Sequence, residues 1–200
     1  MDSAAILAGG RATRFGGRDK SALLVEGRTI RERQIAALAP LTDDLQIVVT
    51  SASARDQAAG ASARCTADIV PGCGPLGALH AALTAARHET LLLIAGDMPY
   101  VTTAFAEYLL SLAAGVDVVV PQSERGYHPL CAVYTRACLE PAAARLADRR
   151  LRMRDLVDSL RARVVPIEDV RRFGDPDRLL ANVNTPADYA GLEALQGHKL

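Results

Sequence analysis

Short apolar runs that alternate with longer segments of helical periodicity constrain the fold of this chain more than any other feature. The runs Leu91–Ile94 and Val118–Val120 consist only of large aliphatic residues and lack the alternation of a half-buried strand. Such runs are typical of the central strands of a parallel sheet, which are buried on both faces. We therefore predict an α/β fold, namely a Rossmann-like, doubly wound and mostly parallel sheet with helices on both faces.

The expected strands and helices alternate along the chain. Strands are expected at Ala4–Leu7, Leu45–Thr50, Thr90–Ile94, Val116–Val120, Leu130–Tyr134 and Arg163–Ile167. Helices are expected at Thr29–Leu38, Leu76–Ala86, Thr102–Ala114, Arg136–Ala147, Arg152–Leu160 and Pro186–Leu195. No linker rich in proline, glycine and serine and no internal repeat interrupts this order, so we expect residues 1–200 to form a single domain.

The composition argues against several classes of function. A formal net charge of +0 and an aromatic content of 4% do not favour binding to nucleic acid or to an anionic membrane. The four cysteines form no C-x-x-C pair, which favours free thiols, with Cys131 in the core and Cys73 in a loop that can expose it. Neither a secretory signal nor an apolar run near the length of a membrane helix is evident, so we expect a cytoplasmic protein.

A glycine-rich, cationic loop follows the first expected strand. Glycines let backbone N–H groups approach a ligand closely, and the three arginines and one lysine of Leu7–Lys20 can add charge-assisted hydrogen bonds to phosphate oxygens. The loop is not a P-loop, because Asp19 rather than glycine precedes Lys20. It also lacks the glycine spacing of a dinucleotide-binding fingerprint. It therefore predicts a polyphosphate site of another kind.

A carboxylate at the end of another strand fits the same chemistry. Asp97 follows the most hydrophobic run of the chain, and ligands of open α/β sheets bind beyond the carboxyl ends of the strands. Carboxylate oxygens are hard ligands that suit Mg²⁺. The competing interpretation is that Asp97 caps the next helix, but Thr102 and Thr103 can supply that cap. We therefore predict that Asp97 binds a metal beside the N-terminal loop.

Near the C-terminus, Thr185 fits a helix N-cap, with Pro186 in the first turn and Asp188 three residues after the cap. This structural explanation does not use Asn182 and Asn184. On an extended segment their side chains point the same way, so they can hold a second substrate or a water on the metal.

The N-terminal loop resembles the loop L-A-G-G-x-x-x-R-[FM]-G-G-x-D-K of the molybdenum cofactor guanylyltransferase family. The match consists of Leu7–Gly10, Arg14–Gly17 and Asp19–Lys20. The other motifs of that family follow in its order, G-P-L at Gly74–Leu76, D-x-P at Asp97–Pro99, H-P at His128–Pro129 and N-x-N-T-P at Asn182–Pro186. The resemblance extends from Ala4 to near Leu195 and implies the fold of nucleotide-diphospho-sugar transferases.

The resemblance also implies residue roles. The catalytic residues would be Lys20, Arg14 and Asp97. The nucleotide would contact Leu7, Ala8, Gly9, Gly10, Lys20, Asp68 and Asp97. Asp97 would bind Mg²⁺, the expected cofactor, and Asp68 would accept hydrogen bonds from the base. The second substrate would contact His128, Asn182 and Asn184.

The implied reaction is guanylyl transfer from GTP to the phosphate of molybdopterin, or of its molybdenum-loaded form, with release of pyrophosphate. Relatives that use CTP usually carry L-A-A-G, so Gly9 favours GTP. The family's asparagine after the second strand is missing from Val48–Ser53, and this weakens the assignment of the base. Two alternatives stay open. One is a related enzyme that uses CTP or another phosphorylated acceptor. The other is a non-catalytic nucleotide-binding module that delivers cofactor to a molybdoenzyme or chaperone.

Overall fold

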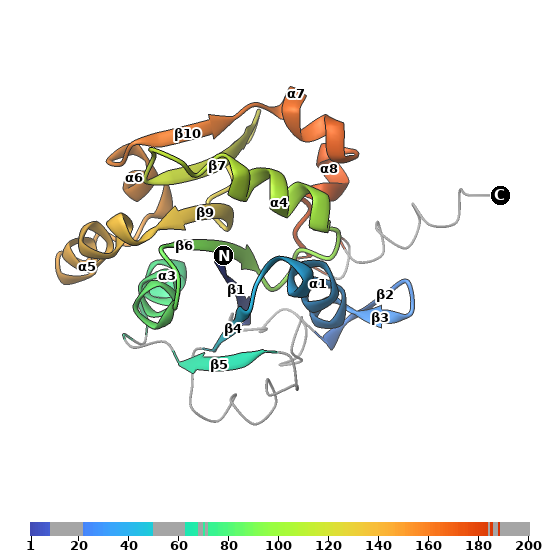
Figure 1. Ribbon diagram of the computed structural model, residues 1–200, viewed down its shortest axis with the longest axis horizontal. Coiled ribbons are helices and arrows are strands. Elements are labelled where there is room, and N and C mark those ends of the chain that lie inside the picture. Colours follow the sequence, from blue (N-terminus) through green and yellow to red (C-terminus); the bar gives the residue numbers. More distant parts are fainter. Residues whose placement is uncertain are drawn as a thin grey trace.

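The computed structural model describes residues 1–8, 22–49, 63–67, 70, 72–183, 185 and 188. Its main sheet has eight strands in the order β10-β7-β9-β6-β1-β4-β5, with β8 paired to β7 (Figure 1). These strands are β1 (Ser3–Ala8), β4 (Asp44–Val49), β5 (Arg64–Ala67), β6 (Thr90–Ala95), β7 (Val118–Ser123), β8 (Gly126–Tyr127), β9 (Cys131–Thr135) and β10 (Ala162–Val165). A separate hairpin consists of β2 (Leu24–Val25) and β3 (Arg28–Thr29). In the main sheet, only β8 and β9 run antiparallel to their neighbours.

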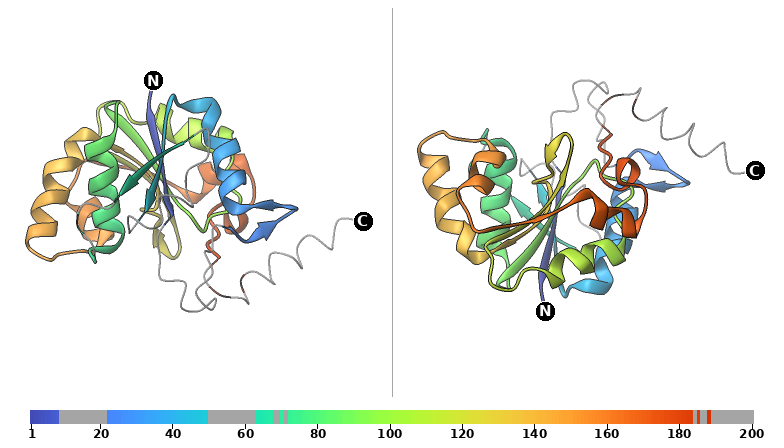
Figure 2. Two further views of the ribbon diagram at one scale, coloured as in Figure 1. Left: turned by 90° about the horizontal axis from the view of Figure 1, so that it is seen from below. Right: turned by 90° about the horizontal axis from the view of Figure 1, so that it is seen from above.

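Helices cover both faces of the sheet, as Figures 1 and 2 show. One face carries α3 (Gly74–Ala85), α5 (Leu139–Ala147) and α6 (Met153–Asp158). The other carries α1 (Ile30–Leu38), α4 (Thr103–Ser111), α7 (Ile167–Val170) and α8 (Pro176–Leu179). Short 3₁₀ turns lie at η3 (Ala39–Leu41), η5 (Arg136–Cys138) and η6 (Arg171–Phe173). The expected doubly wound, mostly parallel architecture is thus confirmed.

The central strands are buried on both faces because successive side chains of a strand point to opposite sides. Leu91 and Leu93 of β6 pack in the core beneath α3 and α5, whereas Leu92 and Ile94 pack beneath α1 and α4. All four side chains are fully buried. The aliphatic run that predicted a central strand therefore supplies both layers of the core.

A buried carboxylate, that of Asp44, connects neighbouring segments at the end of the sheet where strands β1, β4 and β5 begin. Asp44 accepts hydrogen bonds from the Ser3 hydroxyl at 2.6 Å, from Arg64 Nε at 2.7 Å and from the Arg87 backbone N–H at 2.9 Å. Burial alone would raise the pKa of Asp44, but these hydrogen bonds outweigh it and hold the pKa at about 2. The carboxylate therefore stabilises the fold in its ionised form.

All six expected strands are present, with ends that differ by a few residues, and five of the six expected helices are present. The sixth, Pro186–Leu195, lies outside the described residues except for Asp188. The β2–β3 hairpin, β5, β8 and the short helices α7 and α8 were not predicted from the sequence. The prediction that Cys73 can be exposed was wrong: it is the N-cap residue of α3, packs into the core beneath that helix and is 1% exposed, while Cys131 is buried as expected. Among the described residues, no helix is long and apolar enough to cross a bilayer.

Candidate active site

Asp97 lies in a tight turn at the carboxyl end of β6. The Met98 N–H donates to Ala95 O at 3.2 Å and closes the turn, in which Asp97 is the third residue. The Gly96 N–H donates to Leu7 O of the neighbouring strand β1 at 3.0 Å. A Cβ atom on Gly96 would lie 2.6 Å from that same oxygen, so this close approach requires glycine. The turn that carries Asp97 therefore lies next to the end of β1, where the glycine-rich segment begins.

The C-terminal segment of the described chain joins the same turn. The Val183 N–H donates to Asp97 O at 2.9 Å, and Asn182 Nδ2 donates to Asp97 Oδ1 at 3.2 Å. Val183 is fully buried in a small apolar cluster with Val25, Ile30 and Tyr100. This cluster lies beneath the turn and ties it to the β2–β3 hairpin and α1.

His128 and Asn182 line one cavity of about 340 Å³. The Ser123 hydroxyl and His128 Nε2 are 2.8 Å apart, which fixes the orientation of the imidazole ring. Burial lowers the pKa of His128, and the positive charge of Arg125 lowers it further, so the ring is neutral at neutral pH. The structure thus brings together two residues that the sequence places more than fifty positions apart, and Asn182 connects them to Asp97.

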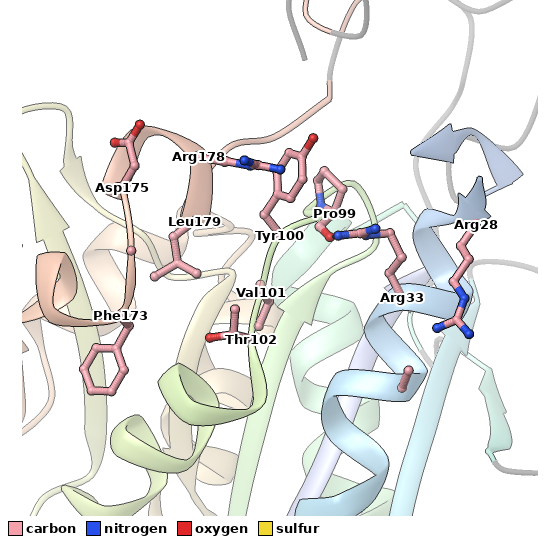
Figure 3. Close-up of a pocket in the computed structure, with 12 residues that line it drawn as sticks. Arg28, Arg33, Pro99, Tyr100, Val101, Thr102, Phe173, Asp175, Arg178 and Leu179 are labelled. Atoms are coloured by element: carbon pink, nitrogen blue, oxygen red, sulfur yellow. The ribbon is translucent and has the colours of Figure 1, made fainter. Parts of the chain in front are cut away.

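A second cavity, of about 420 Å³, is lined by residues that follow the Asp97 turn, among them Pro99 and Tyr100, and by Arg33 of α1 and Arg178 of α8 (Figure 3). The guanidinium of Arg178 lies 4.2 Å from the centroid of the Tyr100 ring, and that of Arg33 lies 5.4 Å from it. Glu26 forms ion pairs with both arginines, at 2.6 and 2.9 Å. Because these residues come from the hairpin, α1, the turn after β6 and α8, the cluster braces four segments around the candidate site.

Of the predicted site residues, Leu7, Ala8, Asp97, His128 and Asn182 are described. Gly9, Gly10, Arg14, Lys20, Asp68 and Asn184 lie outside the described residues, so their places in the site stay predictions.

Two predicted helix caps are confirmed. Thr102 Oγ1 accepts from the Phe105 N–H, so Asp97 is not needed as the cap of α4. Thr185 and Asp188 exchange capping hydrogen bonds of 2.8 and 3.1 Å.

The fold matches solved nucleotidyltransferase structures. Molybdopterin-guanine dinucleotide biosynthesis protein A from Archaeoglobus fulgidus superposes with a TM-score of 0.84 at 23% identity, covering 98% of each chain. The 2-C-methyl-D-erythritol 4-phosphate cytidylyltransferase from Thermus thermophilus gives a TM-score of 0.67 at 18% identity, again covering 98% of each chain. The chain thus has the nucleotide-diphospho-sugar transferase fold that the resemblance implied.

The chain belongs to the family defined by the MobA-like NTP transferase domain, whose model matches residues 4–164. It is 33% identical over 183 residues to a probable molybdenum cofactor guanylyltransferase from Pelotomaculum thermopropionicum, covering 92% of this chain and 87% of that protein. It is 34% identical over 191 residues to a molybdenum cofactor guanylyltransferase from Desulfosudis oleivorans, covering 94% and 93%. These matches confirm the expected family.

Proposed function

We propose that this protein transfers the guanylyl group of GTP to the phosphate of molybdopterin or of its molybdenum-loaded form. The observation that carries the proposal is the position of Asp97, hydrogen-bonded to Asn182 and one residue from the contact between Gly96 and Leu7. A carboxylate between the start of the glycine-rich loop and the cavity lined by His128 and Asn182 can serve both substrates of such a transfer. The printed names of the relatives support the choice of substrates.

In the proposed reaction an oxygen of the acceptor phosphate attacks the α-phosphorus of GTP. The bond from this phosphorus to the oxygen that bridges to the β-phosphate breaks, and pyrophosphate leaves with the electron pair. The acceptor phosphate is already ionised near neutral pH, so the chain needs no strong general base. Its task is to position both substrates and to neutralise charge. Backbone N–H groups at Gly9 and Gly10, with Arg14 and Lys20, would hold the triphosphate, and Asp68 would accept from the base.

The residues around Asp97 fit Mg²⁺ that arrives with the nucleotide. Among the described residues, no group of three or more His, Cys, Asp or Glu side chains is placed to hold a metal. Mg²⁺ in phosphate-transfer sites is typically held by one or two carboxylates together with substrate phosphates and water. At Asp97 the ion would neutralise charge that develops on the phosphate oxygens.

The cavity lined by His128 and Asn182 is the proposed site of the acceptor. Because the ring of His128 is neutral and held by Ser123, it offers a directed hydrogen bond rather than a charge. The lining also holds Arg125, whose positive charge can meet an anionic acceptor, together with the carboxylates of Asp177 and Asp188. Asn182 lies between this cavity and Asp97, so an acceptor there would meet the carboxylate region directly.

The test is pyrophosphate release from GTP, CTP and ATP, each with Mg²⁺ and molybdopterin. We expect turnover with GTP, and losses on the order of 100-fold or more for Asp97→Asn and Lys20→Met, the scale of one lost preorganised charge contact. The matched control is Asp43→Asn, because Asp43 is an exposed carboxylate paired with His88 near the amino edge of the sheet.

The alternatives give other outcomes. Turnover with CTP, or with another phosphorylated acceptor, would replace the proposed substrates but keep the reaction class. Tight GTP binding without pyrophosphate release, for every acceptor tested with Mg²⁺, would favour a module that delivers cofactor to a molybdoenzyme or chaperone.

A further inference from the structure

We infer that Gln34 is a positioning residue, which fixes from helix α1 the turn that presents Asp97. The inference rests on the proposed function in one respect, the role of Asp97 as the carboxylate that binds the divalent ion. It concerns a residue of a separate element, 63 positions before Asp97 in the chain.

The geometry of Gln34 locks both ends of the turn. Its Nε2 donates to Ala95 O at 2.7 Å and to Met98 O at 3.0 Å. These are the first and last residues of the four-residue turn, so Asp97 lies between the two anchored carbonyls. Gln34 is 1% exposed, and a hydrogen bond shielded from water is harder to replace by solvent.

The amide of Gln34 serves the turn rather than the packing of the core. Its Oε1 is buried and has no hydrogen-bond partner within the described part of the chain. A buried acceptor left unpaired costs free energy, and an apolar side chain of the same size would avoid that cost. What glutamine adds at this position is therefore its two donors, and both go to the turn that carries Asp97.

Arg33, the residue before Gln34 in α1, holds the same turn through a further hydrogen bond. Arg33 Nε donates to Pro99 O at 3.0 Å, and Figure 3 shows the guanidinium beside Pro99 and Tyr100. Its Nη1 also contacts Val25 O at 3.4 Å and Glu26 at 2.9 Å. Two neighbouring helix residues thus hold three carbonyls on either side of Asp97 and connect them to the hairpin.

Helix α1 provides a firm base for these contacts. A capping box formed by Thr29 and Glu32 closes its first turn, with hydrogen bonds of 2.8 and 3.1 Å. Gln34 therefore projects from the middle of an ordered helix, and the turn is held in one conformation before any substrate binds. Without the two donors, Met98 O loses the Gln34 hydrogen bond and Ala95 O keeps only the one from the Met98 N–H, so the turn can open.

The principal test is Gln34→Met, which keeps the size of the side chain but removes both donors. We expect the Mg²⁺ concentration for half-maximal activity to rise on the order of 10-fold, as is usual when support behind a metal ligand is lost. Mn²⁺ binding to the complex with GTP, measured by electron paramagnetic resonance, should weaken by a similar factor. Hydrogen exchange at the Met98 amide should become faster, which reports on the turn without any turnover.

The matched control is Gln46→Met, because Gln46 is an equally buried glutamine in β4. Its Nε2 donates to Ala82 O at 3.3 Å and its Oε1 accepts from Thr66 at 3.0 Å, so its amide holds the sheet and α3. We expect Gln46→Met to lower stability while the affinity for Mn²⁺ stays at the wild-type value. A weakening of metal binding equal to that of Gln34→Met would show a general effect of instability and overturn the inference.

Two further variants test the inference if Gln34→Met does not fold and separate it from the proposed metal site. If Gln34→Met does not fold, Arg33→Met removes the neighbouring contact to Pro99 O from a more exposed position and should weaken Mn²⁺ binding to a smaller extent. Wild-type metal binding and Met98 exchange in the folded variant that is tested would overturn the inference. Asp97→Asn separates the two proposals, because wild-type Mn²⁺ binding in that variant would refute the metal site itself.

Discussion

The contact between Gly96 and strand β1 predicts a large effect for a single methyl group. In Gly96→Ala the new Cβ would lie 2.6 Å from Leu7 O, a distance that real Cβ atoms essentially never show. Because the obstacle is backbone in the central strand β1, the turn must move away. This movement strains the hydrogen bond of 3.0 Å from Gly96 N to the same oxygen. Overpacking and the weakened hydrogen bond together should cost about 2–4 kcal/mol of unfolding free energy.

The displacement should also reduce activity, because Asp97 is the next residue. A shift near 1 Å at a reacting centre costs on the order of 100-fold in rate. Urea denaturation measures the stability change, and pyrophosphate release at saturating Mg²⁺ measures the rate. Activity should be compared at a temperature where the variant stays fully folded.

Gly115→Ala is the control for a general sensitivity to alanine in place of glycine. Gly115 lies between α4 and β7 with a φ of 76° and open space around its Cβ position. It should lose about 1 kcal/mol from its left-handed backbone conformation and keep its activity. A Gly96→Ala variant that matches the wild type in both stability and rate would refute the steric argument.

Three further predictions concern stability, thiol chemistry and the cavity lined by His128 and Asn182. The folded pKa of Asp44, about 2, lies below its ordinary value of 3.8, so this carboxylate stabilises the protein above about pH 4 and loses that contribution as pH falls towards 2. The contribution is on the order of 2 kcal/mol, and urea titrations should show a weaker acid dependence for Asp44→Asn. Maleimide should label half-buried Cys65 first, while labelling of Cys73 at a similar rate would contradict its burial. Asn182→Ala should raise the KM for the acceptor more than the KM for GTP, and steady-state kinetics with each substrate varied would reveal the opposite order.

The elements that the sequence predicted well are those specified by local composition. The Leu91–Ile94 run and the capping threonines carry their structural information within a few residues. The missed elements depend on partners that are distant along the chain. Strand β5 has only one buried residue among its four and becomes a strand by pairing with β4 at the edge of the sheet. The strands of the β2–β3 hairpin are shorter still, with two residues each, and the exposed Leu24 gives no alternating pattern.

The residues of the candidate site also fall into those that local sequence predicts and those that only the fold brings together. Asp97 could be predicted because a strand end, an oxygen ligand and a following proline occur together in the sequence. The proximity of His128 to Asn182 was expected only from the resemblance and needs the fold to bring the two side chains to one cavity. The role of Gln34 could not be predicted from the sequence, because a polar residue in a helix is normally expected on its exposed face. The hydrogen bonds to Ala95 O and Met98 O in the folded protein explain why a glutamine is buried there.

The way the three segments of the site are joined explains which positions should tolerate substitution. Leu7 O binds the Gly96 N–H, and the Val183 N–H binds Asp97 O, so backbone atoms connect β1, the turn and the C-terminal segment. These bonds depend little on side-chain identity, and conservative apolar changes at Leu7 and Val183 should preserve the geometry of the site. Sensitivity should concentrate where the side chain itself is required, at Gly96 for its lack of a Cβ and at Gln34 for its two donors. If apolar exchanges at Leu7 or Val183 impaired metal binding as strongly as Gln34→Met, packing rather than these hydrogen bonds would determine the position of the carboxylate.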